Sequence, residues 1–302
     1  DDQRRKDIFV SPSNLGEAWP GDRVVVALLP QRKGRNPEGR IVRILERRMQ
    51  NVPVLLHQKM KNNLYWAQPM DPNLHIKFLA QVSSLPTRAQ TGDVVVISPD
   101  QRLDKDLWQG NATELLGPET DISVQEAVVK LNHHIPVEFS PEAIKQADGL
   151  PQDPDPEDMD GRKDFRDLPF VTIDGASAKD FDDAVCVKKT NTGYELLVAI
   201  ADVSHYVPIG SPLDRQARSR GNSYYFPQSV EPMFPPALST GLCSLNPNVP
   251  RLAMVVDMVF TPTGKRIRAD YYPAVISSQA RLTYTQVKKA VLDEEPQARE
   301  KI

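Results

Sequence analysis

Short apolar runs separated by turns rich in Gly, Pro and Asp dominate the chain. Early runs lie at 8–10, 24–29 and 41–45, and later runs span 194–200, 251–260 and 267–277. Runs of this length that are rich in β-branched residues predict β-strands. Apolar residues recur with helical spacing at 121–135, 213–220 and 285–292. The pattern predicts a multidomain protein whose first part is mainly β and whose later part is α+β.

Two of the predicted strand segments repeat with the same offset along the chain. Gly21–Val26 matches Gly92–Ile97, and Gly39–Leu45 matches Gly110–Leu116. Because both pairs of segments are separated by the same number of residues, the sequence indicates duplicated β modules. Short strands with Gly turns and basic residues are typical of OB-type barrels, which bind single-stranded nucleic acid. We expect one module at 1–48 and another at 49–120. Because a five-stranded barrel needs about 70 residues, only the C-terminal part of the first is expected here.

Charge and aromatic residues add to this picture of the modules. Residues 1–48 contain eleven Lys or Arg against seven Asp or Glu. The basic residues that lie along or between the predicted strands are Lys6, Arg32, Lys33, Arg35, Arg40, Arg43, Arg47 and Arg48. In the second module, Tyr65, Trp66 and Phe78 are candidates for stacking on nucleic-acid bases, although strand aromatics more often belong to a core.

Residues 121–167 are predicted to form a helical segment followed by an acidic, Pro-rich linker. His133 and His134 end the helical pattern, and a His pair at a helix end is more often a cap than a metal site. Pro and Asp dominate 149–167. Proline fixes φ and like charges repel, so this stretch is predicted to be an extended surface connector at the main domain boundary.

Four aspartates gather between two apolar runs. Asp174 follows the first run, and Asp180, Asp182 and Asp183 precede the second. Like charges at close range raise one another's pKa unless cations neutralise them. Oxygen ligands without nearby His or Cys favour Mg²⁺, or Mn²⁺, over Zn²⁺. A solvated turn or a structural Ca²⁺ site is an alternative, but the ligand order of the helix-flanked calcium loop is absent from 174–187.

These aspartates lie within a series of motifs that resembles the catalytic domain of the ribonuclease II/R family. The motifs are Leu168–Gly175, Asp180–Ala184, Val198–Ser204, Tyr225–Pro227, Leu242–Pro247 and Ala280–Tyr284. The likeness covers roughly 165–290 and extends more weakly over the preceding residues. It implies cold-shock-like OB-fold barrels followed by an α+β RNB catalytic domain at 168–302, with both ends of the whole protein missing.

The resemblance also implies a reaction, namely Mg²⁺-dependent 3′ to 5′ hydrolysis of single-stranded RNA to nucleoside 5′-monophosphates. By the same resemblance, Asp174 and Asp183 are direct metal ligands, Asp180 is a supporting ligand and Asp182 is the residue most critical for chemistry. Tyr225 matches the tyrosine that stacks on the 3′-terminal base. The residues themselves suggest further roles: Arg215, Arg218 and Arg220 are candidate phosphate contacts, and Asp202 is a candidate outer-shell acid.

Composition limits the remaining alternatives. The net charge is −3, and no apolar run approaches the eighteen or so residues of a membrane span. Cys186 and Cys243 have no zinc-like spacing and are expected to be reduced core residues of a cytoplasmic protein. The expected partners are single-stranded RNA and the rest of the protein's own catalytic and S1 domains. An RNA-binding regulator with an inactive nuclease domain is the alternative function.

Overall fold

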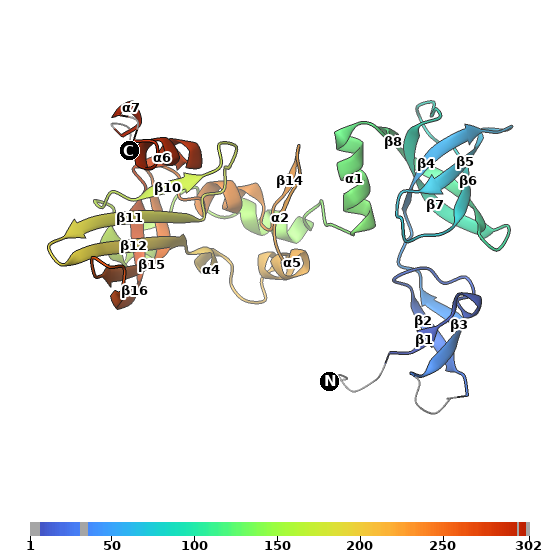
Figure 1. The fold of residues 1–302 in the computed structure, drawn as a ribbon, viewed down its shortest axis with the longest axis horizontal. Coiled ribbons are helices and arrows are strands. Elements are labelled where there is room, and N and C mark those ends of the chain that lie inside the picture. Colours follow the sequence, from blue (N-terminus) through green and yellow to red (C-terminus); the bar gives the residue numbers. More distant parts are fainter. Residues whose placement is uncertain (1–6, 31–35, 295, 300–302) are drawn as a thin grey trace. The chain divides into compact units, whose positions relative to one another are not determined.

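The computed structural model describes residues 7–30, 36–294 and 296–299. The chain forms two compact units, one made of Asp1–Ile135 with Phe226–Gln228 and the other of Pro136–Tyr225 with Ser229–Ile302. Figure 1 shows the helices and strands of both units. Four members of the predicted basic group, Lys6, Arg32, Lys33 and Arg35, lie outside the described residues.

Both units contain helices and strands. The first unit contains β1 (Phe9–Val10), η1 (Pro12–Asn14), β2 (Arg23–Leu28), β3 (Glu38–Glu46), β4 (Val52–Lys59), β5 (Leu64–Pro69), β6 (Lys77–Gln81), β7 (Asp93–Arg102), β8 (Leu107–Pro118) and α1 (Ile122–Asn132). The second contains α2 (Pro141–Asp148), α3 (Pro156–Met159), β9 (Lys163–Phe165), β10 (Val171–Asp174), β11 (Asp183–Thr190), β12 (Gly193–Ala201), α4 (Val203–Tyr206), α5 (Pro212–Arg220), β13 (Tyr224–Tyr225), β14 (Val230–Glu231), η2 (Ala237–Leu242), β15 (Pro250–Phe260), β16 (Arg266–Ser277), β17 (Ala280–Thr283), α6 (Tyr284–Val291) and α7 (Pro296–Arg299).

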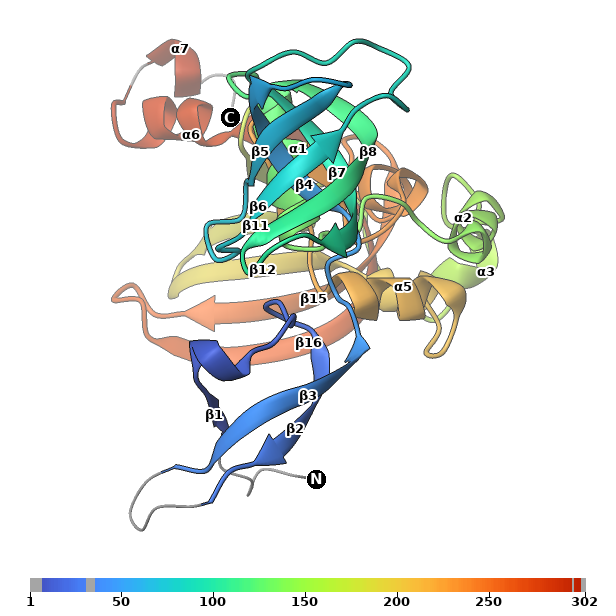
Figure 2. The same cartoon turned by 90° about the vertical axis from the view of Figure 1, so that its right-hand side faces the viewer.

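Five strands of the first unit close into a barrel in the order β4-β5-β6-β8-β7. Figure 2 shows these strands wrapped around one another. Alternate side chains of each strand point inward, as the period of two in a strand requires, and they build the barrel core. The preceding module forms a three-stranded sheet in the order β1-β3-β2. The prediction of an OB-type barrel followed by an α+β domain is therefore confirmed.

The two modules have equivalent hydrogen bonds, as the sequence repeat predicts. The Asp22 carboxylate accepts from the Trp19 backbone N–H at 2.8 Å, and at the equivalent turn of the barrel the Asp93 carboxylate accepts from the Gln90 N–H at 2.8 Å. The β2–β3 and β7–β8 pairings have the same register after the shared offset, and both carry bulges at the corresponding positions. Matched turns, registers and bulges support duplication of one β module.

Two equivalent glycines allow the paired strands to approach closely. A Cβ placed on Gly39 would overlap Val26 Cγ1, and one on Gly110 would lie 3.0 Å from Ile97 Cδ1. A Cβ on Gly39 would also lie 2.9 Å from Ile8 Cγ2, so more than one neighbour would have to shift. Both modules therefore favour glycine at this position because the facing aliphatic side chain occupies the space.

The first module contributes one large side chain to the core of the barrel. Trp19 is buried, and its ring makes edge contacts with Phe78 and Trp108 at centroid distances of 6.1 and 5.0 Å. The Arg47 guanidinium lies 4.3 Å from the Trp19 ring centroid and pairs with Asp22 at 2.7 Å. The predicted boundary at residue 48 thus separates segments that share one hydrophobic core.

The second unit is built on a seven-stranded sheet in the order β17-β10-β11-β12-β15-β16-β9. Its central strands are antiparallel, while β10 pairs with β17 and β16 pairs with β9 in parallel. The core contains buried side chains from α2, α5 and η2 together with those of one sheet face, among them Ala147, Leu213, Leu238, Ala199 and Val255. This mixed arrangement is the predicted α+β class.

The structure corrects the prediction that 149–167 is an extended connector. Within it lie the helix α3 and the strand β9, which is hydrogen-bonded to β16 at the edge of the sheet. Asp153 also pairs with the buried Arg251 at 2.7 Å. Because these contacts join the stretch to the second unit, the division between the units falls at residue 135 rather than at 167.

The predicted helix at 121–135 is present as α1. The Asp121 side chain accepts from the Ser123 N–H at 2.8 Å and so caps its first turn. His133 is the C-cap residue, which confirms that the His pair ends the helix. His134 follows with a φ of 52°, in the left-handed region.

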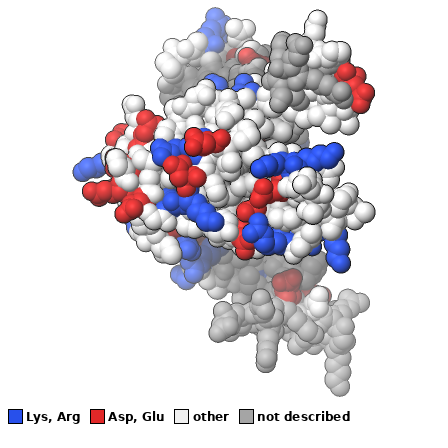
Figure 3. All heavy atoms as spheres, turned by 90° about the vertical axis from the view of Figure 1, so that its left-hand side faces the viewer, with Lys and Arg blue, Asp and Glu red and all other residues white. Residues whose placement is uncertain are grey.

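Charges of both signs are mixed on the surface of the second unit. Basic and acidic side chains lie next to one another on the face in Figure 3. Arg268, for instance, pairs with Asp257 at 3.2 Å and with Asp270 at 2.8 Å. Within residues 7–30, 36–294 and 296–299, no helix combines the length and apolar character needed to cross a bilayer.

Candidate active site

The predicted acidic residues lie at one edge of the seven-stranded sheet. Asp174 ends β10 and Asp183 begins the antiparallel neighbour β11, so both lie at the same end of this strand pair. The Asp182 carbonyl accepts from the Ala201 N–H at 2.9 Å, which fixes it beside the end of β12. Asp180 lies two residues earlier in the intervening loop. The fold thereby brings all four aspartates to one region.

The aspartates lie close enough for their charges to change the pKa of Asp174 and Asp182. Burial raises the pKa of Asp174, and the charges of Asp183 and Asp180 raise it further. The pKa of Asp182 is also raised, first by burial and then by Asp180, Asp183 and Asp174. In addition, Asp174 Oδ2 is buried and has no hydrogen-bond partner among the described residues. A buried, unpartnered carboxylate oxygen among like charges is an environment that a cation would stabilise.

The donor chemistry of the four aspartates fits a hard divalent cation such as Mg²⁺. Among the residues that the structure describes, however, no three His, Cys, Asp or Glu side chains are positioned to hold a metal ion together. The unpartnered Asp174 oxygen and the raised pKa of Asp174 and Asp182 agree with a metal site. The side chains would need to move toward a common point to share an ion.

A buried serine fixes the loop that carries Asp180 and Asp182. Ser244 is fully buried, and its Oγ accepts from the Phe181 N–H at 3.0 Å and donates to the Lys179 carbonyl at 3.2 Å. The Leu245 N–H donates to the Phe181 carbonyl at 2.9 Å. Ser244 is not among the predicted site residues, although it lies in the motif Leu242–Pro247.

Tyr225 lies next to the acidic group, as its predicted role requires. Its hydroxyl donates a hydrogen bond to Asp180 Oδ2 at 2.7 Å. This bond to a carboxylate raises the pKa of Tyr225 to about 12, with smaller contributions from burial and from the charge of Asp180. The residue remains 66% exposed. Its aromatic ring is therefore largely accessible to solvent beside the aspartates.

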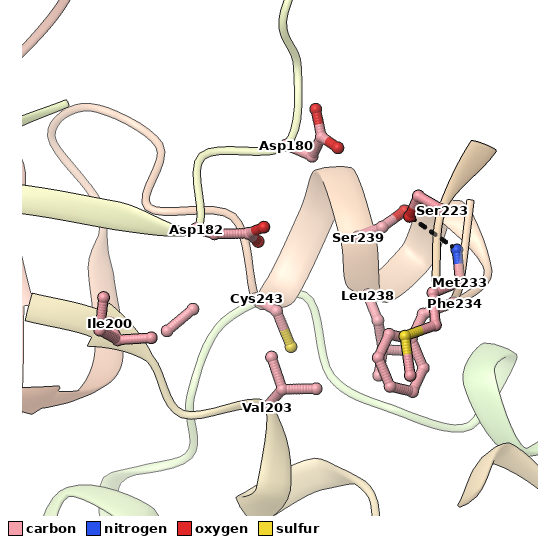
Figure 4. Close-up of a pocket in the computed structure, with 11 residues that line it drawn as sticks. Asp180, Asp182, Ile200, Val203, Ser223, Met233, Phe234, Leu238, Ser239 and Cys243 are labelled. Atoms are coloured by element: carbon pink, nitrogen blue, oxygen red, sulfur yellow. Dashed lines mark hydrogen bonds between the residues drawn. The ribbon is translucent and has the colours of Figure 1, made fainter. Parts of the chain in front are cut away.

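A cavity of about 300 Å³ adjoins Asp180 and Asp182. Figure 4 shows the Asp182 side chain extending toward the helix that carries Leu238 and Ser239. The apolar part of the lining includes Val203, Phe234, Leu238 and Cys243. Burial, followed by the charge of Asp182, raises the pKa of Cys243 to about 12, so the thiol stays protonated at neutral pH. The carboxylates thus border a small, largely apolar recess.

Of the three candidate arginines on α5, the structure excludes one as a phosphate contact. Arg220 is only 2% exposed, and its guanidinium donates to the carbonyls of Pro136, Glu138 and Pro232. Arg215 and Arg218 are exposed, and Arg218 pairs weakly with Asp214 at 3.5 Å. Arg220 is a structural residue because it is buried and its guanidinium donates to three backbone carbonyls.

Two of the three aromatic candidates of the barrel are buried, and the third is partly exposed. Phe78 is fully buried, and Tyr65 is 3% exposed with its hydroxyl donating to the Ala89 carbonyl at 3.0 Å. Neither ring is accessible for stacking on a base, so both assignments are corrected to core residues. Trp66 is half-buried, with the Lys77 ammonium 5.5 Å from its ring centroid. Of the three, Trp66 alone keeps an accessible ring.

Asp202, the predicted outer-shell acid, is buried in an ion-pair network behind the site. It pairs with Arg162 at 2.8 Å and accepts from the Ser204 hydroxyl at 2.9 Å. His205 Nε2 lies 2.9 Å from Asp158. Asp202 directly follows Ala201, the last residue of β12, and the Ala201 N–H donates to the Asp182 carbonyl. The network therefore supports the end of β12 next to Asp182.

Comparisons with known proteins agree with this fold. The RNB domain model matches residues 162–302, and the Ribonuclease B OB domain model matches residues 1–44. Ribonuclease R of Vibrio cholerae is 41% identical over 98% of this chain and 36% of its own length. The chain spans roughly a third of the length of such curated relatives.

Solved structures of other proteins have the same fold. The RNase R of Mycoplasma genitalium, solved with ribose-methylated single-stranded RNA, has a TM-score of 0.80 and 31% identity over 95% of this chain and 46% of that one. Yeast Ssd1, described as a pseudonuclease, shares the fold at a TM-score of 0.63 and 18% identity over 96% of this chain and 43% of its own. The chain therefore belongs to the RNB-domain family of ribonuclease R.

Proposed function

We propose that this chain is part of a divalent-metal-dependent exoribonuclease that hydrolyses single-stranded RNA in the 3′ to 5′ direction and releases nucleoside 5′-monophosphates. The observation that carries the proposal is the gathering of four aspartates at one sheet edge, where burial first, and the neighbouring aspartate charges second, raise the pKa of Asp174 and Asp182. The likeness to Vibrio cholerae ribonuclease R and to the RNA-bound RNase R of Mycoplasma genitalium supports it.

Asp174, Asp180, Asp182 and Asp183 would hold Mg²⁺, or Mn²⁺, in this proposal. Such an ion, when bound, supplies Lewis-acid polarisation of a phosphoryl oxygen and a water of lowered pKa. The carboxylates contribute the negative charge that attracts the ion. The Ser244 hydroxyl accepts from the Phe181 N–H and donates to the Lys179 carbonyl, and the Leu245 N–H donates to the Phe181 carbonyl. These bonds fix the loop of Asp180 and Asp182.

Other residues of the chain would bind and orient the RNA. The accessible ring of Tyr225 can stack on a terminal base of any sequence, because every base has a π-face. Its hydroxyl at the same time orients the Asp180 carboxylate. Trp66 with Lys77, on the barrel, is a second candidate contact that combines stacking with positive charge.

The test is to incubate the full-length protein with 5′-labelled single-stranded RNA and to resolve the products by length. Progressive shortening is expected with Mg²⁺ and should stop with EDTA. Asp182→Asn should abolish shortening while RNA binding remains. Asp270→Asn is the matched control, because Asp270 lies on the same sheet and pairs with Arg268 outside the acidic group. Equal shortening by Asp182→Asn and the parent would refute the assignment.

An RNA-binding regulator with an inactive nuclease domain is the second candidate. The same fold occurs in yeast Ssd1, described as a pseudonuclease, so the fold alone does not imply activity. Presence of all four aspartates favours the enzyme. RNA binding without Mg²⁺-dependent shortening by the full-length protein would favour the regulator.

The proposal extends to location and to partners. Cys186 and Cys243 are free and buried, which supports a reducing compartment such as the cytoplasm. We propose that the chain acts together with the further catalytic and S1 domains that the family resemblance implies, and the curated relatives are long enough to contain such domains.

A further inference from the structure

Arg281, on β17, contacts the loop that joins the first aspartate to the other three. β17 pairs in parallel with β10, and Arg281 lies opposite Thr172, two residues before Asp174. Its Nη2 donates to the carbonyl oxygens of Gly175, Ala176 and Ala178 at 3.0, 2.6 and 3.3 Å. One nitrogen therefore holds three of the five residues between Asp174 and Asp180.

These bonds act on a loop that is already fixed at its other end. The Ala178 N–H donates to the Gly175 carbonyl at 3.2 Å and closes a turn inside the loop. Beyond it, Ser244 holds Lys179 and Phe181. The Arg281 guanidinium carbon also lies 5.3 Å from the centroid of the buried Phe181 ring. The path from Asp174 to Asp180 is thus held from two sides by residues distant in the sequence.

Arginine at this position is not the best choice for stability alone. Nε of Arg281 is buried and has no hydrogen-bond partner in the part of the chain that the structure describes. A buried donor left without a partner costs about 1–3 kcal/mol. The contacts of Nη2 with three carbonyls, all within the loop between Asp174 and Asp180, point to a role at the acidic site.

We propose that Arg281 is a positioning residue that sets the spacing between Asp174 and the group Asp180, Asp182 and Asp183, and thereby the affinity of the site for divalent cations. The inference rests on the proposed function, since it assumes that these aspartates share a metal. Arg281 itself does not touch the metal or the substrate in this role. Lysine cannot replace it fully, because a compact ammonium lacks the planar guanidinium whose carbon lies 5.3 Å from the Phe181 ring centroid.

The test measures Mn²⁺ affinity of the full-length protein by electron paramagnetic resonance, for the parent, Arg281→Met and Arg281→Lys. We expect Arg281→Met to weaken binding by about 10- to 100-fold, as loss of an outer-shell partner typically does, and Arg281→Lys to fall between it and the parent. Arg268→Met is the matched control, since Arg268 pairs with Asp257 and Asp270 on the neighbouring strands β15 and β16. Equal affinities of the parent and Arg281→Met would overturn the inference.

Hydrogen exchange of the loop separates this inference from the proposed function. Without metal, the Ala178 and Phe181 amides should exchange about tenfold faster in Arg281→Met than in the parent, because the loop opens more often. A parent that binds no Mn²⁺ would refute the proposed function, and unchanged exchange would still refute the role of Arg281. Should Arg281→Met fail to fold, Arg281→Lys decides both measurements.

Discussion

Replacing Arg220 by methionine tests whether this arginine is structural or binds RNA. The guanidinium donates to the carbonyls of Pro136 and Glu138 at 2.8 Å each and to that of Pro232 at 3.2 Å. Its carbon lies 3.8 Å from the Phe139 ring centroid. Methionine has a similar length and fills much of the space, but it donates no hydrogen bond.

The expected loss follows from these contacts. Each hydrogen bond from the charged guanidinium to a carbonyl contributes about 1.5–3 kcal/mol, and the contact with Phe139 contributes about 1 kcal/mol more. Removing a buried charge recovers part of this sum because the guanidinium no longer has to be desolvated. We therefore expect the free energy of unfolding to fall by about 3–5 kcal/mol, the range for breaking a buried charge network.

The assay is urea unfolding followed by circular dichroism. Arg218→Met is the matched control on the same helix, and its exposed side chain, paired with Asp214, predicts a loss of about 0.5 kcal/mol or less. A loss under about 1 kcal/mol for Arg220→Met, the low end for an unsatisfied buried group, together with weaker RNA binding, would refute the structural assignment and restore the phosphate contact.

Three further predictions follow from the acidic group and from the β modules. In EDTA, Asp182→Asn should stabilise the fold at neutral pH by about 1 kcal/mol or less, because the raised pKa means that stability falls as pH rises. Thermal unfolding should show this gain shrinking as pH approaches the ordinary value of 3.8. Asp22→Ala should cost about 2–3 kcal/mol in urea unfolding and Asp93→Ala about 1, since Asp22 also accepts from Arg47 and from the backbone N–H of residue 48. Trp66→Ala should weaken RNA binding by about 1–3 kcal/mol in fluorescence anisotropy, and unchanged affinity would remove this side chain from the RNA path.

The acidic site was predictable from the sequence because its residues follow and precede strand-forming runs. Strand ends of an antiparallel pair meet at one edge, so Asp174 and Asp183 had to lie near one another once β10 and β11 paired. The contribution of Arg281 and Ser244 was not predictable. Both reach the loop through tertiary hydrogen bonds to partners far away in the sequence, and local patterns carry no information about them.

The burial of Arg220 had a signal in the spacing of the apolar residues along α5. Leu213, Ala217 and Arg220 have the spacing i, i+4 and i+7, which places Arg220 on the apolar face of α5. Strand β9 had no such signal. It is three residues long, lies among Pro and Asp, and exists because it pairs with the distant β16. Short edge strands depend on tertiary context more than on propensity.

The insertion of Trp19 into the barrel has a practical consequence for anyone who dissects this protein. A polypeptide starting at Met49 would keep every barrel strand yet leave an empty pocket against Phe78 and Trp108. Vacating the space of a large aromatic ring typically costs about 3–5 kcal/mol, a sizeable share of what keeps a small domain folded. A shortened protein should therefore start upstream of Trp19, although the repeat places a module boundary at residue 48.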